Sequence, residues 1–264
     1  RDPEMSRGLG DVYKRQNQMS NGYEVFAQYY DTLTQNIDYR KRALYFDFLL
    51  QKYGVKPNGL VLDLACGTGS LSEELDSLGY DVIGVDNSPD MLSIAMNKKF
   101  ESGKNILYIC QDMRSLNLYG NVDAAICALD SINHLESIDD VKKVFKRVHL
   151  FCEPKGLFIF DINTEFKHKS ILGEHTFIYD AEDVYCVWKN SCENSRVLIE
   201  LDFFVPDKNG RYSRYEESFY ENSYPLELIE SALKETGFEI LLIRDGEKDS
   251  SVSETTQRLS LIQI

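Results

Sequence analysis

The sequence lacks the features that would place this chain in a membrane, on a nucleic acid or around a metal ion. No uninterrupted apolar run reaches the roughly eighteen residues of a membrane span, and the N-terminus has no apolar signal-peptide core. Only 29 lysines and arginines stand against 43 acidic residues, and a net charge of −14 disfavours a polyanionic partner. The six cysteines include no Cys-x-x-Cys pair, and the four histidines have no ligand spacing. We therefore expect a cytoplasmic protein with reduced thiols, no metal ion and no membrane or nucleic-acid partner.

Length and composition favour one main α/β domain with an insertion. A chain of 264 residues can bury one large core, and 43% hydrophobic with 12% aromatic residues is typical of globular proteins. The first eighteen residues show no hydrophobic period and resemble translated adaptor or vector sequence. We predict that residues 1–18 are a non-native leader and that the natural protein begins at Met19.

Two helices and an alternating series of strands and helices are predicted up to residue 165. Apolar residues at three- and four-residue spacing indicate helices from Tyr23 to about Leu33 and from about Tyr39 to Tyr53. The strands then predicted are Leu60 to Leu64, Asp81 to Val85, Ile106 to Ile109, Val122 to Cys127 and Leu157 to Asp161. The helices between them are Ser70 to Leu78, Ser88 to about Phe100 and Ile138 to Phe151. This alternation indicates βαβ units and a doubly wound parallel sheet.

The character of the sequence changes at about Phe166. Val197 to Val205 and Arg211 to Tyr220 alternate with period two and are joined by Asn209-Gly210, which is a hairpin signal. We predict that residues 166–224 form an antiparallel β-meander inserted into a main domain of residues 19–165 and 225–264. The elements expected after the insertion are a helix from Leu226 to Lys234 and strands from Phe238 to Ile243 and from about Thr255 to Ile262.

The most informative segment is Val61-Leu-Asp-Leu-Ala-Cys-Gly-Thr-Gly69, a buried strand that ends in a loop of small residues and opens a helix. Small residues at Ala65, Gly67 and Gly69 let the backbone turn sharply and approach a ligand. Asp63 stands just before the loop, where it can orient the loop and attract a cationic group.

Two further acidic residues end the next two predicted strands. Asp86 is placed to accept both hydroxyls of a ribose, and Asp112 to meet an adenine amino group, with Met113 packed beside the ring. Because the carboxyl ends of parallel strands meet at one edge of a sheet, the three acids predict a single nucleoside site.

These residues resemble the class I S-adenosylmethionine-dependent methyltransferase family, in which DxxxGxG follows the first strand, an acid closes the second and Asp-Met follows the third. The sequence looks most like a bacterial small-molecule group of mostly unassigned substrate, with Tyr30-Asp31 in the first helix and Asp130-Ser-Ile-Asn133 after the fourth strand. The resemblance runs from about Tyr23 to the C-terminus. It implies a Rossmann-like fold, S-adenosyl-L-methionine as cofactor, and in-line methyl transfer to nitrogen or oxygen of a small molecule.

The resemblance also implies roles for individual residues. Gly67, Thr68 and Gly69 would line the methionine end of the cofactor, and the Ala128-Leu129 backbone would meet its amine, while Tyr30 would cover it. The expected cofactor-binding residues are Tyr30, Asp63, Ala65, Gly67, Thr68, Gly69, Asp86, Asn87, Met91, Asp112, Met113 and Leu129. The acceptor candidates are Tyr39, Asn133 and Tyr215, and no catalytic residue is assigned. Phe219 and Asn222 replace the His and Arg usual in the group's lid strand, so no substrate role is carried over to them.

Other interpretations stay open. A nicotinamide-dependent oxidoreductase also uses a glycine loop and a ribose-binding acid, but Ser72 replaces the third glycine of its G-x-G-x-x-G fingerprint. A non-catalytic S-adenosylmethionine-binding or partner-binding protein would need the same cofactor residues. A tRNA, rRNA or protein acceptor would keep the chemistry, although the acidic charge disfavours nucleic acid. Asp130, Asn133 and His134 could simply cap a helix. We expect the meander to act as a lid or acceptor platform and the protein to be a monomer or homodimer.

Overall fold

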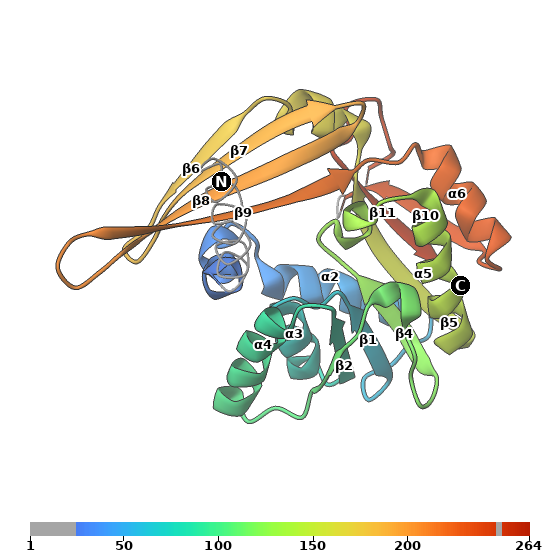
Figure 1. The fold of residues 1–264 in the computed structure, drawn as a ribbon. Helices are drawn as coiled ribbons and strands as arrows, with labels where there is room; N and C mark the ends of the chain where they lie inside the picture. The colour runs from blue at the N-terminus through green and yellow to red at the C-terminus, as the bar shows by residue number, and fades with distance from the viewer. Residues whose placement is uncertain (1–24, 247–249) are drawn as a thin grey trace, which may run out of the picture.

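The computed structural model describes residues 25–246 and 250–264, which form two β-sheets and the helices that pack on them (Figure 1). Residues 25–33 are helical. The later helical segments are α2 (Tyr39–Lys52), α3 (Ser70–Ser77), α4 (Pro89–Ser102), η1 (Met113–Ser115), η2 (Ser131–His134), α5 (Ile138–Phe151), η3 (Lys167–Leu172) and α6 (Leu226–Glu235). The proposed leader, residues 1–18, and the start at Met19 lie outside the described residues.

The larger sheet has seven strands in the order β10-β11-β5-β4-β1-β2-β3. Its strands are β1 (Leu60–Leu64), β2 (Asp81–Asp86), β3 (Leu107–Cys110), β4 (Val122–Cys127), β5 (Cys152–Asn163), β10 (Ile240–Asp245) and β11 (Arg258–Gln263). The pairs among β1 to β5 are parallel, whereas β11 runs antiparallel to both β5 and β10. The predicted doubly wound α/β sheet, completed by a terminal hairpin, is therefore confirmed.

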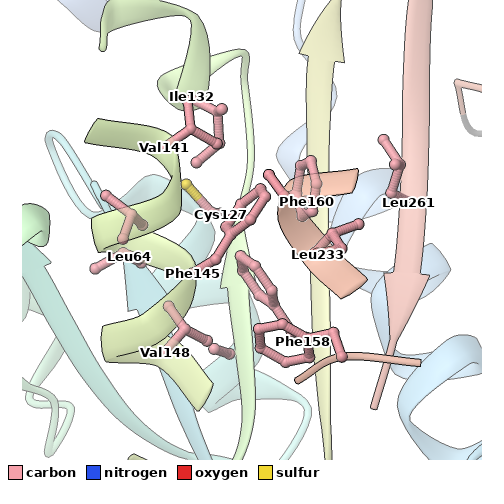
Figure 2. Packing of buried hydrophobic residues seen from close by; sticks show 14 of the residues in the cluster. Leu64, Cys127, Ile132, Val141, Phe145, Val148, Phe158, Phe160, Leu233 and Leu261 are labelled. Carbon is pink, nitrogen blue, oxygen red and sulfur yellow. The ribbon is translucent and has the colours of Figure 1, made fainter. Parts of the chain in front are cut away.

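The sheet is buried on both faces because its central strands are mostly continuous apolar runs. Along β5, Phe158 and Phe160 pack with α5 and α6, as Figure 2 shows, while Leu157 and Ile159 face α2 and α3 on the other side. Successive side chains of a strand point to opposite faces, so a continuous apolar run supplies two cores at once. Helices on both faces leave the carboxyl ends of the strands as the open edge at which a ligand can bind.

The smaller sheet is antiparallel, in the order β6-β7-β8-β9, and lies between β5 and α6 in the chain. Its strands are β6 (Thr176–Asp180), β7 (Tyr185–Glu193), β8 (Arg196–Pro206) and β9 (Tyr212–Asn222). Alternate residues of β8 pack on the N-terminal helix through Phe26 and Tyr29, which places that helix against this sheet (Figure 1). The predicted inserted β-meander is thus confirmed. The exact domain boundaries remain a prediction.

Several element ends differ from the prediction. Strand β5 extends to Asn163 because β11 pairs with it as far as Arg258. The local sequence of β5 does not indicate that β11 will be its partner. Strand β11 begins at Arg258 rather than near Thr255, because Thr256 forms a turn in which its hydroxyl accepts a hydrogen bond from the Ser253 amide. Within residues 25–246 and 250–264, no helix is long and apolar enough to span a membrane.

Candidate active site

A cavity of about 500 Å³ lies where the carboxyl ends of the large sheet face the inserted sheet. The loops after β1 to β4 form one side of it, the N-terminal helix a second, and side chains of β7 and β9 a third. This volume is in the ordinary range for small-molecule sites. A shallower hollow of about 480 Å³ at the opposite end of the strands is lined by residues 53–59, 123 and 153–156, away from the glycine loop.

The glycine loop after β1 adopts the left-handed backbone that its small residues permit. Ala65, Gly67 and Gly69 have φ of 59°, 55° and 75°. A Cβ at Gly69 would collide with the Tyr108 hydroxyl, so packing requires this glycine, whereas a Cβ at Gly67 would meet nothing within 4 Å. Because Gly67 lines the cavity, the open space beside it is space for a ligand.

Asp63 supports this loop from beneath. Its side chain is buried and accepts a hydrogen bond of 2.5 Å from the hydroxyl of Ser72, the residue that replaces a third glycine. Burial raises the pKa of Asp63 to about 7, against the lowering effect of the Ser72 hydrogen bond. Asp63 and Thr68 line a small hollow of about 40 Å³ that shares walls with the main cavity.

Asp86 joins the loops that follow β1 and β2. Its two carboxylate oxygens accept the backbone N–H groups of Gly67 at 2.8 Å and of Ser88 at 2.9 Å. Burial raises the pKa of Asp86, and these backbone hydrogen bonds oppose that rise. Asp86 lines the cavity together with Asn87 and Met91, as expected for a group that meets a ligand.

Asp112 and Met113 also line the cavity, on the loop after β3. The Asp112 carboxylate is engaged by Arg114 at 2.5 Å, and this hydrogen bond lowers the pKa of Asp112. Two of the predicted acids thus line one cavity, and Asp63 lies in the adjoining hollow.

The loop after β4 carries two consecutive left-handed residues, Leu129 and Asp130, with φ of 59° and 55°. Their N–H groups both donate to Asp161 at the end of β5, at 3.0 and 2.7 Å. Two fixed hydrogen bonds to one buried carboxylate hold this strained turn in place. The Asp130 side chain makes no helix-capping hydrogen bond, so that alternative is wrong for this residue.

A buried ion network stands behind this turn. Arg258 from β11 binds Asp130 at 2.5 Å and Asp161 at 2.6 Å, and Arg42 from α2 binds Asp161 at 3.0 Å. Burial alone would raise the pKa of Asp130, but Arg258 and Lys167 outweigh it and hold that pKa well below its usual range. The sequence gives no sign of the role of Arg258, because its partners lie far away in the chain.

The N-terminal helix is fixed to the glycine loop through Asp31. Its carboxylate accepts hydrogen bonds from the hydroxyls of Thr68 at 2.7 Å and Ser70 at 3.1 Å, and pairs with Lys98 at 2.5 Å. These contacts place the neighbouring Tyr30 in the cavity wall, where burial raises the pKa of its phenol. The helix therefore closes one side of the cavity.

The wall opposite the glycine loop comes from β5, η3 and the inserted sheet. Its polar members meet at Asn163, whose Nδ2 donates to Asp130 at 2.9 Å and to Glu221 at 3.1 Å, while its Oδ1 accepts from Lys167 at 2.8 Å. The aromatic residues of this wall are Tyr179, Trp188 and Phe219. Lys167, Trp188 and Glu221 were not among the site residues predicted from the sequence, although all three lie in the insertion expected to act as a lid or acceptor platform. We call the set Asn163, Lys167, Tyr179, Trp188, Phe219 and Glu221 the acceptor wall.

Comparison with known proteins identifies the family. Residues 61–156 match the family described as "Methyltransferase domain". YqeM of Bacillus subtilis (strain 168), named as a methyltransferase with no assigned acceptor, is 33% identical over 241 residues, which are 90% of this chain and 94% of YqeM. A solved S-adenosylmethionine-dependent methyltransferase of Clostridium acetobutylicum ATCC 824 superposes with a TM-score of 0.83 at 35% identity, over 91% of this chain and 98% of that one. The chain belongs to the S-adenosylmethionine-dependent methyltransferase family.

S-Adenosylmethionine is therefore the methyl donor of this methyltransferase, and the predicted enzyme class is confirmed. The nicotinamide-dependent and non-catalytic alternatives are wrong. A further relative, the glycine/sarcosine/dimethylglycine N-methyltransferase of Actinopolyspora halophila, is 30% identical over 234 residues, covering 82% of this chain and 38% of that protein.

The residues predicted to bind the cofactor gather as a group, although not all in one place. Those that line the main cavity are Tyr30, Ala65, Gly67, Asp86, Asn87, Met91, Asp112, Met113 and Leu129. Asp63 and Thr68 line only the small hollow, and Gly69 lines neither space. Within the described residues, no cluster of side chains could hold a metal ion.

The three predicted acceptor residues do not line the main cavity of the methyltransferase. Asn133 is fully buried, and its amide is hydrogen-bonded to the backbone of Asn163 and of Asn222. Tyr215 packs with the N-terminal helix cluster, and Tyr39 lines the small hollow. Asn133 is therefore a structural support of the acceptor wall, placed behind it.

Proposed function

We propose that this methyltransferase transfers the methyl group to a nitrogen or oxygen of a small molecule that binds between the glycine-loop edge and the acceptor wall. The observation that carries the proposal is the single cavity that has both of these sides. In-line displacement needs acceptor, methyl carbon and sulfur on one line in a site that excludes water, and two facing walls provide that geometry.

The residues on the glycine-loop side fit S-adenosylmethionine, which supplies a methyl group on a positively charged sulfur. Gly67 leaves open space where a side chain would stand, and its N–H is held by Asp86. We infer that Asp86 and Asn87 hold the ribose, and that Asp112 and Met113 flank the adenine. Tyr30, on a helix fixed to this loop by Asp31, covers the bound cofactor.

A small acceptor is favoured by the enclosure of the cavity. The N-terminal helix and the inserted sheet pack on each other through Phe26, which contacts Phe203 and Phe219 in ring pairs of 6.3 and 5.7 Å. A polymer would need an open groove, and a nucleic acid would also need a basic surface that a chain of net charge −14 does not supply. The A. halophila relative, named for N-methylation of glycine and its methylated forms, supports a small amine.

The inserted sheet acts in this proposal as lid and acceptor platform. Its residues Trp188, Phe219 and Glu221 supply part of the acceptor wall. Because inserted elements at the carboxyl ends of strands complete sites in such folds, the sheet would set which acceptor is used.

The test is methyl transfer from S-adenosyl-L-[methyl-³H]methionine to a bacterial extract that is then separated into low-mass filtrate, RNA and protein. Calorimetric titration with S-adenosylhomocysteine, using NADH and NADPH as controls, first establishes that the preparation binds its cofactor. We expect label in the low-mass filtrate. If the tritiated methyl group were found only in RNA or protein, the proposed acceptor class would be wrong, while the assignment of the cofactor would still hold.

A further inference from the structure

Most charged side chains around the cavity already form ion pairs or hydrogen bonds within the protein. Those bound to opposite charges or to backbone N–H groups are Asp86, Asp112, Arg114, Asp130 and Arg258. Glu136 lies at the exposed rim. Two charged side chains of the acceptor wall differ from these, Lys167 and Glu221, because neither is paired with an opposite charge in a well-formed hydrogen bond among the described residues.

The Lys167 ammonium has unused hydrogen-bonding capacity. It donates to Asn163 Oδ1 at 2.8 Å, and no carboxylate oxygen in residues 25–246 and 250–264 lies within 4.0 Å of it. An ammonium has three N–H donors, so two remain for a ligand. Burial lowers the pKa of Lys167, and the Asp130 carboxylate only partly opposes that fall.

Glu221 likewise keeps an oxygen for a ligand. Its side chain is buried, and Oε2 accepts from Asn163 at 3.1 Å, whereas Oε1 accepts no hydrogen bond from the described residues. Behind it, His168 is fully buried, with Nδ1 at 3.2 Å from the Ser195 carbonyl oxygen and Nε2 at 3.4 Å from Glu221 Oε2. A carbonyl only accepts, so Nδ1 carries the hydrogen in this contact and Nε2 has no hydrogen-bond partner.

Asn163 keeps the two charges side by side without letting them pair. Its Oδ1 binds the Lys167 ammonium while its Nδ2 binds the Glu221 carboxylate, so one amide group separates them on the same wall. A cation and an anion held apart in this way match a ligand that carries both charges.

We propose that the methyl acceptor is a small zwitterion, an amine that carries a carboxylate, with Lys167 binding the carboxylate and Glu221 Oε1 binding the amine. This inference rests on the proposed function, since it names the class of small molecule that the same cavity takes. The aromatic side chains Tyr179, Trp188 and Phe219 form the apolar sides against which the carbon frame packs.

The placement of Glu221 also gives the proton a route. An ammonium has no lone pair, so the acceptor first transfers one proton to Glu221. The nitrogen lone pair then forms the bond to the methyl carbon as the carbon–sulfur bond breaks, and the sulfur keeps that electron pair. Glu221 later releases that proton from Oε1 to solvent. Each turnover thus yields one N-methylated zwitterion, one S-adenosylhomocysteine and one proton.

The experiment compares matched sets of three compounds with one carbon frame. Each set contains a zwitterion, the amine without the carboxylate and the acid without the amine: β-alanine, ethylamine and propionate; 4-aminobutyrate, propylamine and butyrate; phenylalanine, phenethylamine and 3-phenylpropionate. We expect a zwitterion to be methylated with kcat/KM about tenfold or more above its amine, because a charge-assisted contact of this kind is worth that factor. The acids should not be labelled.

Variants separate the two contacts. Lys167→Met should raise KM for the zwitterion and bring its kcat/KM down to about that of the amine, with a much smaller loss for the amine itself. Glu221→Gln should lower kcat about 100-fold for both amines and zwitterions, the usual size of a general-base effect. Lys169→Met and Glu216→Gln are the controls, since these side chains are exposed and paired with Glu165 and Arg214.

A second readout does not depend on turnover. In calorimetric titration of the protein saturated with S-adenosylhomocysteine, the best zwitterion should bind about tenfold more weakly to Lys167→Met than to Lys169→Met. Equal kcat/KM for zwitterion and amine, or an equal loss of both in Lys167→Met, would overturn the inference. Methylation of phenols or alcohols alone would overturn the zwitterion inference but would agree with the proposed function. Label found only in macromolecules would contradict both the zwitterion inference and the proposed function.

Discussion

Two glycines of the same loop should respond to alanine substitution in different ways, because one is needed for packing and the other for the ligand. Both have positive φ, so an added Cβ costs about 1–2 kcal/mol of backbone strain at either position. At Gly69 that Cβ also collides with the Tyr108 hydroxyl and lies 3.0 Å from Ala95 Cβ. Overpacking of a tight core adds about 1–3 kcal/mol. At Gly67 the Cβ meets no protein atom within 4 Å and would project into space beside the cavity.

We therefore expect Gly69→Ala to lower the free energy of unfolding by about 2–5 kcal/mol, and Gly67→Ala by only about 1–2 kcal/mol. Gly67→Ala should in turn weaken S-adenosylhomocysteine binding at least about tenfold, because the methyl group occupies ligand space. Gly210→Ala is the matched control, since this hairpin glycine has φ of 74° and nothing within 4 Å, far from the cavity.

Urea unfolding curves give the stability of the three variants, and calorimetry gives their affinity for S-adenosylhomocysteine. Gly210→Ala should match Gly67→Ala in stability and the unmodified protein in affinity. A Gly67→Ala variant that binds S-adenosylhomocysteine as tightly as the unmodified protein would contradict the assignment of Gly67 to the ligand site. A Gly69→Ala variant no less stable than Gly210→Ala would contradict the assignment of Gly69 to packing.

Three further predictions concern Asp63, Arg258 and Trp188. Burial raises the pKa of Asp63 from 3.8 to about 7, so the folded protein holds a proton that the unfolded chain has released, and this contribution to stability is lost as pH rises from about 4 to 7. Asp63→Asn should flatten that decline in urea unfolding measured across the range; a parallel decline would refute it. Arg258→Met removes the ion-pair partner of Asp130 and leaves Asp161 with Arg42 alone, so it should destabilise the protein by about 3–5 kcal/mol. Lys142→Met, which breaks an exposed pair, should hardly shift the urea midpoint. Trp188, the only tryptophan, lines the acceptor wall, so ligand binding should change its fluorescence emission; constant emission at saturation would count against its placement there.

Most strands of the large sheet could be predicted from the sequence, because each is marked by a local pattern of residues. Strands such as Leu60–Leu64 and Val122–Cys127 are short apolar runs between turn residues, and the structure has both with the predicted ends. The terminal strand was less well placed. Its start at Arg258 depends on pairing with Asn163 of β5, and a contact across that much chain leaves no periodic signal.

The acceptor wall shows the same limit within one strand. Tyr215 and Glu221 lie on the same face of β9, because side chains six positions apart in a strand point the same way. At about 3.4 Å per residue they stand roughly 20 Å apart, so the face can be predicted from alternation but the position of the cavity along it cannot. Tyr215 was the candidate from the sequence, and Glu221 is the residue that lines the cavity.

Asn133, a residue of the Asp-Ser-Ile-Asn motif, positions the residues of the site although it does not line the cavity. Its amide joins the backbone of Asn163, at the end of β5, to that of Asn222, at the end of β9. One strand belongs to the large sheet and the other to the inserted sheet, so this buried amide fixes the distance between the two halves of the acceptor wall. Lys167 and Glu221 then take their positions from Asn163. The loop after β4 would therefore set the geometry of the acceptor site by positioning, while the chemistry is carried by side chains of the insertion.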